Sequence, residues 1–495
     1  MGALPDGNLC GYLRDCCDLA SGSLPPGHAK DTVTAVRSRL EAGLLRVAVG
    51  GRLNAGKSTL VNALLGEKLA DTNATECTKL VSRFTYGLMN QVVIWFTDGA
   101  TFTCAAQPLA SAVASAGRPV GDVDFIEVRS SNKRLATEYT LVDTPGLDTL
   151  TDGLDDMSLA ALGEADVLLY VMPHPGDNDV EALTALRRKA GGAGITALST
   201  IGVLSRIDQL GQGAGDPWPV ARRQAERYAD QLTALFGTVI PVLGLLAETA
   251  LGDRFTESDL APLRALLELR ATDPEAVEFA LYSAEDFKQE PRLPLTGAER
   301  TRLLDLLGNH GVSVALDVLD GGVRSATALL AALRAHSGID ALTSQLSRQF
   351  AGLADPLRAR SAVQALDAVS WLGASPQETA VLARLREDLD AVRDHPRLRQ
   401  FGLMTVLADL EAGRWQGPTG TAAELAAFAT GTDLTAQLGL AADASTAQVR
   451  ARLVDRVTAW RVLENSATSS RATSRRAREV REYLESLFDT LPPPG

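Results

Sequence analysis

The segment covering residues 44–65 constrains this chain more than any other part of its sequence. A β-rich apolar run at 44–49 leads into a loop with the pattern G-x-x-x-x-G-K-[ST], and a helical pattern follows at 59–65. Glycines let such a loop curl around phosphate oxygens, and the start of the helix presents free amide donors. The segment therefore predicts a nucleotide-phosphate site on a strand–loop–helix unit. The residues assigned to it are Gly51, Asn54, Ala55, Gly56, Lys57, Ser58 and Thr59.

Charged and hydroxyl side chains complete the predicted phosphate site. Lys57 places a positive charge at the β and γ phosphates and is assigned a catalytic role, while Ser58 is expected to bind Mg²⁺. The run at 141–146, Leu-Val-Asp-Thr-Pro-Gly, supplies the second half of the site, because its apolar strand ends with an acid for the metal, Asp143. The amide of Gly146 is then expected to reach the γ phosphate.

A polar loop at 71–78 lies between these two motifs, where a threonine is expected to close over Mg²⁺ and the γ phosphate. Thr78 is the first choice for this residue and Thr75 is the second. Thr78 is therefore assigned both a metal-binding and a catalytic role. An ordinary solvated loop threonine remains the alternative interpretation.

Residues 203–208, Val-Leu-Ser-Arg-Ile-Asp, stand where GTP-binding proteins carry [NT]-K-x-D after a buried strand. The Asp208 carboxylate can accept hydrogen bonds from both N1 and N2 of guanine, a pattern that adenine cannot satisfy. Arg206 can lie along the base, and Ser205 can brace the phosphate loop. The predicted ligands are GTP or GDP with Mg²⁺. The alternative is that the S-R-x-D residues form an ordinary surface turn that reads no base. Residues 241–247 occupy the position of a last base-contacting loop.

Apolar strand-like runs alternate with helical stretches as far as about residue 250. Besides 44–49, the expected strands cover residues 80–85, 92–96, 125–128, 139–142, 167–172, 200–204 and 239–242. This alternation predicts an α/β domain of three layers with a mainly parallel sheet. Farther on, Leu, Ala and Arg recur at spacings of three and four, which predicts an all-α bundle. The expected boundaries are 1–44, 45–275, 276–464 and 465–495.

Local signals mark several helix ends in the second half. Residues 375–378, Ser-Pro-Gln-Glu, form a capping box, and Gly308 suits a helix end or a kink. The last helix is expected to cover 471–488. Helices at both ends of the chain flank the α/β domain, so they could pack together as one neck.

Composition excludes several classes of protein. The formal net charge of −13 opposes a general nucleic-acid binder, because such proteins need a basic surface. The 5 cysteines lack metal-ligand spacing and are expected to be reduced thiols of a cytoplasmic protein. There is no apparent secretory leader and no run of about 18 apolar residues that could span a bilayer. Any membrane contact is expected to be peripheral.

Taken together, these motifs resemble those of bacterial dynamin-like GTPases, and within them the mycobacterial isoniazid-induced proteins and their actinobacterial relatives. The matching stretches are GRLNAGKSTLVNALLGEKLA, TNATECTKLV, LVDTPGLD, IGVLSRIDQLG and PVLGLLA. The resemblance runs from about residue 30 to 345, including LGNHGVSVALDVL at 307–319, and continues more loosely to the end. The S-R-x-D variant is similar to this subgroup rather than to GTPases at large.

The resemblance implies a P-loop GTPase head, an elongated helical neck and trunk, a lipid-binding tip, and hydrolysis stimulated when heads dimerise. Lys57, Ser58, Thr78, Asp143, Gly146 and Asp208 fall on the nucleotide positions of the family. Asn54 falls where dynamins place a polar residue near the β and γ phosphates, so it is either catalytic or shapes the loop. Leu147 stands where small signalling GTPases carry the glutamine that orients water. Another group must therefore position the attacking water.

Two segments are candidates for the lipid-binding tip, residues 371–373 and 401–404, although each also suits a helix core. Several arginines make the last helices basic, which suits anionic lipid, salt bridges or a solvated face. They are Arg450, Arg452, Arg456, Arg461, Arg471, Arg475, Arg476, Arg478 and Arg481.

The expected partners are a second head in a homodimer, a second dynamin-like chain, and the anionic inner face of the cell membrane. No nucleic-acid partner is expected. The leading function is GTP hydrolysis coupled to membrane remodelling. The alternatives are a GTP-binding scaffold in cell division or septum formation and, less favoured, a ribosome-assembly GTPase.

Overall fold

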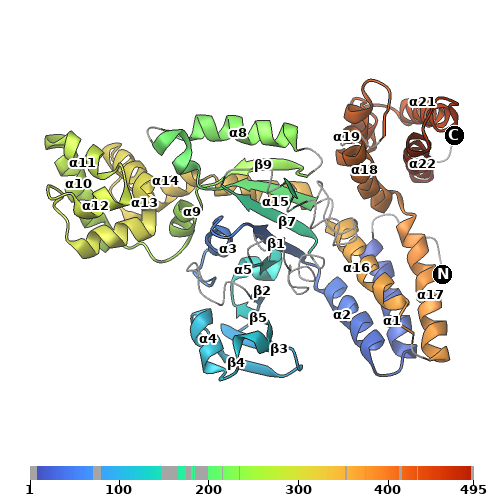
Figure 1. Ribbon diagram of the computed structural model, residues 1–495, viewed down its shortest axis with the longest axis horizontal. Coiled ribbons are helices and arrows are strands. Elements are labelled where there is room, and N and C mark those ends of the chain that lie inside the picture. The colour runs from blue at the N-terminus through green and yellow to red at the C-terminus, as the bar shows by residue number, and fades with distance from the viewer. Residues whose placement is uncertain are drawn as a thin grey trace.

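A nine-stranded sheet forms the centre of the described chain (Figure 1). The structure is a computed structural model, and it describes residues 8–70, 80–145, 165–173, 180–181, 183, 199–213, 216–232, 235–351, 354–373, 375–411, 415–431 and 433–491. The strand order is β4-β3-β5-β2-β6-β1-β7-β8-β9. The strands are β1 (Leu45–Gly51), β2 (Val81–Tyr86), β3 (Gln91–Phe96), β4 (Thr101–Ala105), β5 (Val123–Ser130), β6 (Tyr139–Asp143), β7 (Val167–Met172), β8 (Thr200–Leu204) and β9 (Thr238–Pro241).

The sheet is mainly parallel, as the sequence predicted. β1 is parallel to both of its neighbours, β6 and β7, and β8 and β9 continue this parallel half. β2 and β5 are parallel to each other, but β2 is antiparallel to β6, and β3 is antiparallel to both β4 and β5. In the parallel half, Val49 of β1 lies level with Asp143 of β6, and Leu204 of β8 lies level with Pro241 of β9. The carboxyl ends of these strands therefore lie at the same edge of the sheet.

Helices cover both faces of this sheet and make the three predicted layers. Val47 and Val49 of β1 join the hydrophobic core that contains α3 (Lys57–Leu65). Ala48 joins a second core, on the side of α8 (Trp218–Gln231). This alternation follows from the two-residue period of a β-strand.

All eight predicted strands are present, with ends that differ from the prediction by at most two residues. β4 is the one strand of the described sheet that the sequence patterns do not predict. Its residues alternate between exposed and half-buried, so the strand lacks the buried apolar run on which the other predictions rested. β4 forms nonetheless because it pairs with β3 along five residues.

On one side of the sheet, helices α10 to α14 form a compact group that we call the helical module (Figure 1). It follows α9 (Gly244–Leu251) and consists of α10 (Leu260–Thr272), α11 (Pro274–Ala280), α12 (Ala284–Gln289), α13 (Gly297–Asp320) and α14 (Ala326–Ser337). Arg300, in the first turn of α13, is buried. The Arg300 guanidinium donates hydrogen bonds to the backbone carbonyls of Phe287, Lys288, Glu290, Leu293 and Leu295 over 2.8–3.4 Å. One side chain thus holds the turn between α12 and α13.

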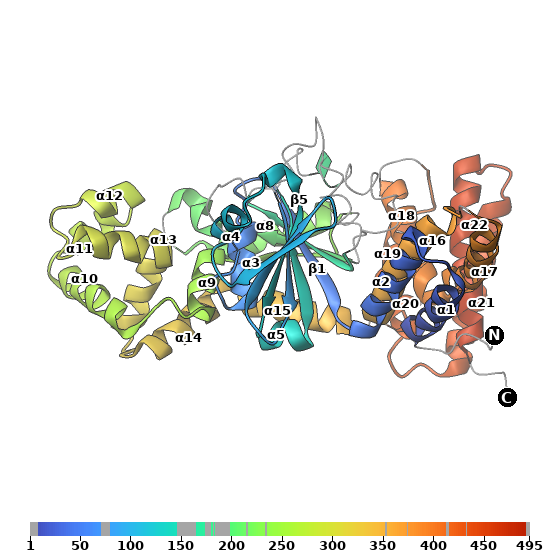
Figure 2. The same ribbon diagram turned by 90° about the horizontal axis from the view of Figure 1, so that it is seen from below.

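On the other side of the sheet, four helices form a bundle, which α15 (Ile339–Ala351) connects to the helical module (Figure 2). The bundle consists of α1 (Leu9–Ser23), α2 (His28–Ala42), α16 (Ala354–Ser370) and α17 (Pro376–Arg393). Asp355 begins α16 and caps α1 by accepting the backbone N–H groups of Leu9 and Cys10 at 2.9 and 3.1 Å. Buried Asp166 accepts the Arg46 N–H at 2.9 Å and the Ser361 hydroxyl, which anchors α16 to the sheet.

The remaining helices form a third group beyond this bundle. They are α18 (Pro396–Glu411), α19 (Thr421–Thr430), α20 (Leu434–Gln437), α21 (Thr446–Asn465) and α22 (Arg471–Ser486). α22 packs against α21 and α18, whereas α1 and α2 pack against α16 and α17. The suggestion that both chain ends share one neck is therefore wrong. The capping box at Ser375 and the kink at Gly308 are present as predicted.

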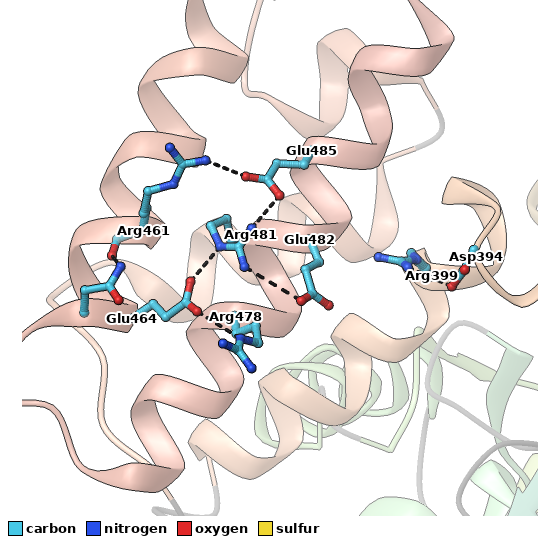
Figure 3. Close-up of polar contacts among 9 residues, drawn as sticks. Asp394, Arg399, Arg461, Glu464, Arg478, Arg481, Glu482 and Glu485 are labelled. Carbon is cyan, nitrogen blue, oxygen red and sulfur yellow. Dashed lines mark hydrogen bonds and ion pairs between the residues drawn. The ribbon is translucent and has the colours of Figure 1, made fainter.

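The arginines of the C-terminal helices form ion pairs with neighbouring carboxylates (Figure 3). Arg481 and Arg478 contact Glu464 at 2.6 and 2.9 Å, and Arg461 contacts Glu485 at 2.7 Å. Arg481, followed by Arg478, holds the pKa of Glu464 below its usual value. Of the three alternatives for the arginine run, salt bridges describe these residues best.

Among the helices of the described residues, none combines the length and apolarity needed to cross a bilayer.

We expect Arg300→Lys to loosen the turn between α12 and α13. Lysine keeps the charge, but it lacks the planar fork that reaches several carbonyls, and each buried carbonyl left unpaired costs about 1–3 kcal/mol. Hydrogen exchange measured by mass spectrometry should show lost protection over residues 284–300. Arg302→Lys is the matched control, because Arg302 is half-exposed and pairs with Asp259. Wild-type protection in Arg300→Lys would contradict this account.

Candidate phosphate and base site

The glycine-rich loop joins β1 to α3 at the carboxyl edge of the sheet. Gly51, the last residue of β1, has a φ of 142°, and a Cβ there would lie 2.2 Å from the Val171 carbonyl oxygen of β7. Gly56 has a φ of 98° and directly precedes Lys57, the first residue of α3. A side chain at either position would be strained, so glycine lets the loop curl over the start of the helix.

Residues after β8 hold this loop from outside. The Ser205 hydroxyl donates to the Ala55 carbonyl at 2.7 Å, and Arg206 Nη2 donates to the Asn54 carbonyl at 2.5 Å. Asn54 and Arg206 both adopt positive φ values, 58° and 50°, which asparagine tolerates better than most side chains. Two consecutive loop carbonyls are therefore fixed by the segment predicted to read the base.

Ser58 and Asp143 meet where the sequence predicts a metal. The Ser58 hydroxyl donates to Asp143 Oδ2 at 2.8 Å. Burial raises the pKa of Asp143 to about 6, although the hydrogen bond from Ser58 and the charge of Lys57 act in the opposite direction. The other carboxylate oxygen, Oδ1, is buried and has no hydrogen-bond partner among the described residues. A hydroxyl beside a carboxylate with one unsatisfied oxygen fits Mg²⁺, which prefers oxygen ligands.

Lys57 is buried at the start of α3, and its Nζ donates to the Arg52 carbonyl at 2.9 Å. The same carbonyl accepts the Ala55 N–H at 3.2 Å. Two donors of the loop therefore converge on one backbone oxygen. Thr59 of α3 lies close to Gly244, because a Cβ placed on Gly244 would be 3.5 Å from Thr59 Cγ2. The segment after β9 is thus placed against the helix of the phosphate loop.

Asp208 lies half-buried in the short 3-10 helix η5 (Ile207–Gly213). It borders a cleft of about 1840 Å³ between the sheet domain and the helical module. Across this cleft, Gly308 interrupts α13 with φ 62° and ψ 174°, and Asn309 and His310 line the wall. The segment at 307–319 therefore lines the same cleft as Asp208, the residue predicted to read the base.

The structure brings eleven of the assigned residues to one edge of the sheet. They are Gly51, Asn54, Ala55, Gly56, Lys57, Ser58, Thr59, Asp143, Ser205, Arg206 and Asp208. Thr78 and its alternative Thr75 lie outside the described residues, as do Gly146 and Leu147. The roles assigned to those four residues stay predictions.

Sequence reasoning missed Asn62, which organises the chain beyond α3. Its Oδ1 accepts the N–H groups of Leu69 and Ala70 at 3.0 and 2.7 Å, and its Nδ2 donates to the Ala70 carbonyl and to Glu248 of α9 at 3.1 and 3.2 Å. Asn62 is fully buried among apolar residues of α3. The sequence did hold a signal for it: Asn62 is a polar residue among the apolar residues of the helix, four positions after Ser58.

Thr144 was part of a recognised motif but had been given no role. Its hydroxyl donates to the Val49 carbonyl at 2.9 Å, and its N–H reaches the same oxygen at 3.3 Å. Thr144 therefore ties the residue after Asp143 to the end of β1. This contact fixes the spacing between the phosphate loop and the carboxylate of Asp143.

Comparison with known proteins gives a consistent family. A model of the dynamin family matches residues 47–207. Isoniazid-induced protein IniC of Mycobacterium tuberculosis is 31% identical over 399 residues, covering 77% of this chain and 79% of that protein. A bacterial dynamin-like protein of Nostoc punctiforme is 26% identical over 220 residues, 42% of this chain and 31% of that protein.

A solved chain from an oligomerised bacterial dynamin pair is also similar, with a TM-score of 0.32, 15% identity and coverage of 77% of this chain and 79% of that chain. A similarity this low adds nothing to the assignment. The family model, by contrast, spans the site from β1 to the start of η5, and the IniC match covers most of both chains. The chain therefore belongs to the dynamin family of GTPases.

Proposed function

We propose that this protein binds GTP with Mg²⁺ and hydrolyses it to GDP and phosphate, with turnover dependent on contact between two heads. The observation that carries the proposal is the pair formed by Ser58 and Asp143 beneath a loop that the base-reading segment holds in place. Membership of a GTPase family supports it. A GTP-binding scaffold without turnover is the alternative that the experiments below distinguish.

Phosphate binding would exchange one acceptor for another. The Arg52 carbonyl accepts hydrogen bonds from Lys57 Nζ and from the Ala55 N–H. Phosphate oxygens carry more negative charge than a carbonyl, so they would take over both donors. Lys57 would then hold its charge at the β and γ phosphates.

Ser58 and Asp143 would hold Mg²⁺, which when bound neutralises charge on the phosphate oxygens. Burial disfavours the ionised form of Asp143, and a neighbouring cation would favour it. We assign Thr78 as a further metal contact and the Gly146 amide as the donor to the γ phosphate.

The attacking water needs a group other than the residue after Gly146, which is Leu147. Asn54 and Thr78, together with a second head, are our candidates. The contact between Arg206 and the Asn54 carbonyl supports a defined position for Asn54 at the mouth of the loop. Asp208 would select guanine by accepting its N1 and N2 hydrogens.

Membrane binding would use the outer end of the four-helix bundle. α2 leads into β1, and α16 runs outward from its anchor at Ser361, so the α1–α2 and α16–α17 connections share the end far from the sheet. Gln377 Nε2 donates to the Ser23 carbonyl across this end at 3.4 Å. Trp371 and Leu372 are 67% and 57% exposed there.

We propose that this end contacts the anionic inner face of the cell membrane peripherally, in a cytoplasmic protein. The Arg386 guanidinium lies 4.0 Å from the centre of the Trp371 ring, which places a cation beside the exposed indole. We further propose that the protein remodels membranes and that a second dynamin-like chain is among its partners.

Lys57→Ala should lower the turnover of GTP by at least about 100-fold, because it removes the positive charge next to the developing phosphate charge. Phosphate release by the purified protein is the measurement. Lys133→Ala, an exposed lysine on α5 (Lys133–Thr137), is the matched control and should leave turnover unchanged. Equal phosphate release by Lys57→Ala and wild type would show that this site does not hydrolyse GTP.

Asp208→Asn should weaken GTP binding by about 10–100-fold, since a charge-assisted pair of hydrogen bonds contributes about 1.5–3 kcal/mol. The same variant should bind xanthosine triphosphate more tightly than wild type, because the asparagine amide can donate to the extra carbonyl of xanthine. Competition against a fluorescent nucleotide measures both affinities. If the variant keeps wild-type preference for GTP, Asp208 does not read the base.

Replacing both Trp371 and Leu372 by serine should reduce sedimentation with phosphatidylglycerol vesicles by at least about tenfold, since each loses about 1.5–3 kcal/mol of apolar burial. The matched control replaces Phe279 and Tyr282, which are 54% and 82% exposed on the helical module. If only the control variant lost vesicle binding, the proposal would be contradicted, and the lipid contact would lie on the helical module.

A further inference from the structure

In the described part of the chain, no strand pairs with the outer edge of β4. β4 ends the strand order of the described sheet and lies at the opposite end from β9 (Figure 1). Its partner on the inner side is β3, with Val93 opposite Thr103. Thr101, Thr103 and Ala105 are exposed, whereas Phe102 and Cys104 are half-buried.

The hydrogen-bond pattern shows which backbone groups of β4 point outward. The Phe96 N–H donates to the Ala100 carbonyl at 2.9 Å, and the Ala106 N–H donates to the Asn90 carbonyl at 3.2 Å. Hydrogen-bonded pairs alternate along an antiparallel ladder, so the even-numbered residues of β4 face β3. The N–H and C=O groups of the odd-numbered residues, centred on Thr103, therefore point away from the sheet.

This edge lacks the features that keep strand edges apart. Natural edges commonly carry lysine, proline or a bulge, and β4 reads Thr-Phe-Thr-Cys-Ala with none of them. The whole chain carries a net charge of −13, so two copies repel each other overall. β4 brings no charged side chain to such an encounter.

We propose that β4 pairs antiparallel with β4 of a second copy of this chain, which joins two sheets into one. Thr103 would lie on the two-fold axis opposite Thr103 of the partner subunit. Thr101 would face Ala105 of the partner subunit, and each facing pair would exchange two backbone hydrogen bonds. The pairing is self-complementary, as a two-fold contact requires.

Exposed apolar residues border the same edge and favour a protein partner. Leu88 and Met89 are 87% and 70% exposed on the connection between β2 and β3. The next residue, Asn90, accepts the N–H of Ala106, directly after β4. A copy paired along β4 would extend over this end of the strand and could cover both side chains.

This contact is separate from the head contact proposed for hydrolysis. β3, β5, β2 and β6 lie between β4 and β1, which carries the phosphate loop. The β4 dimer should therefore form without nucleotide, and it does not rest on the proposed GTPase activity. Lys57→Ala should dimerise as wild type does, so failure of either proposal is recognisable by itself.

The test is Thr103→Pro, measured by light scattering during gel filtration without nucleotide over a range of protein concentrations. Proline removes the outward N–H and is tolerated on edges where that group faces solvent, so the bond network to β3 is kept. Thr103→Ser keeps the N–H and is the matched control. Wild type and Thr103→Ser should approach twice the monomer mass of 52.3 kDa, while Thr103→Pro should stay at 52.3 kDa.

Thr103→Lys provides an independent variant that keeps the backbone donor. Two lysines facing each other across the axis repel, so its dimer dissociation constant should rise at least about tenfold at low salt. Circular dichroism should show that both variants remain folded. A wild-type protein that stays monomeric at every concentration, or folded Thr103→Pro and Thr103→Lys variants that dimerise like wild type, would overturn the proposal.

Discussion

The shape of the phosphate loop depends on two hydrogen bonds from the end of β8. Ser205 and Arg206 hold the carbonyls of Ala55 and Asn54 on the outside of the loop. In a trans peptide the carbonyl and the following N–H point in opposite directions. Fixing the Ala55 carbonyl outward therefore directs the Gly56 N–H inward, toward the place where phosphate would bind. On the proposed function, the backbone of this loop would couple recognition of the base to recognition of the phosphates.

The same end of the sheet is joined to the helical module through α9. The Thr249 hydroxyl donates to the carbonyl of Leu306, which lies just before the kink in α13 at Gly308. On the other side of the kink, Gly311 packs so closely on Leu246 that a Cβ would lie 2.8 Å from its side chain. α9 directly follows β9, so a shift of the loop between them, which is predicted to contact the base, would reach both halves of α13.

The sequence predicted the parts of the fold that local patterns encode. Each motif of the site follows a buried strand, and parallel strands bring such ends to one edge, so Ser58, Asp143 and Asp208 could be grouped before their positions were known. β4 was not predicted because it forms by pairing with β3, the one strand that pairs with it in the described sheet, and its residues Thr-Phe-Thr-Cys-Ala do not indicate that contact.

Long-range polar contacts were equally hidden from local patterns. Asn62 binds Glu248, which lies 186 residues farther along the chain, and Asp166 binds the Ser361 hydroxyl of α16. Neither pair follows from spacing in the sequence. The expectation that helices at both chain ends pack into one neck was wrong for the same reason. Helical periodicity identifies a helix, but it does not show which other helix packs against it.

The paired arginines also change where an attraction to membrane would originate. Glu464, Glu482 and Glu485 pair with Arg461, Arg478 and Arg481, so these three arginines offer little free positive charge to anionic lipid. On the proposed membrane function, the apolar pair Trp371 and Leu372 would supply most of the binding free energy. Apolar burial is insensitive to salt, whereas exposed charge attraction is screened over about 10 Å at 0.1 M. Vesicle binding by this protein should then persist at high ionic strength, in contrast to proteins that hold membranes through a basic patch.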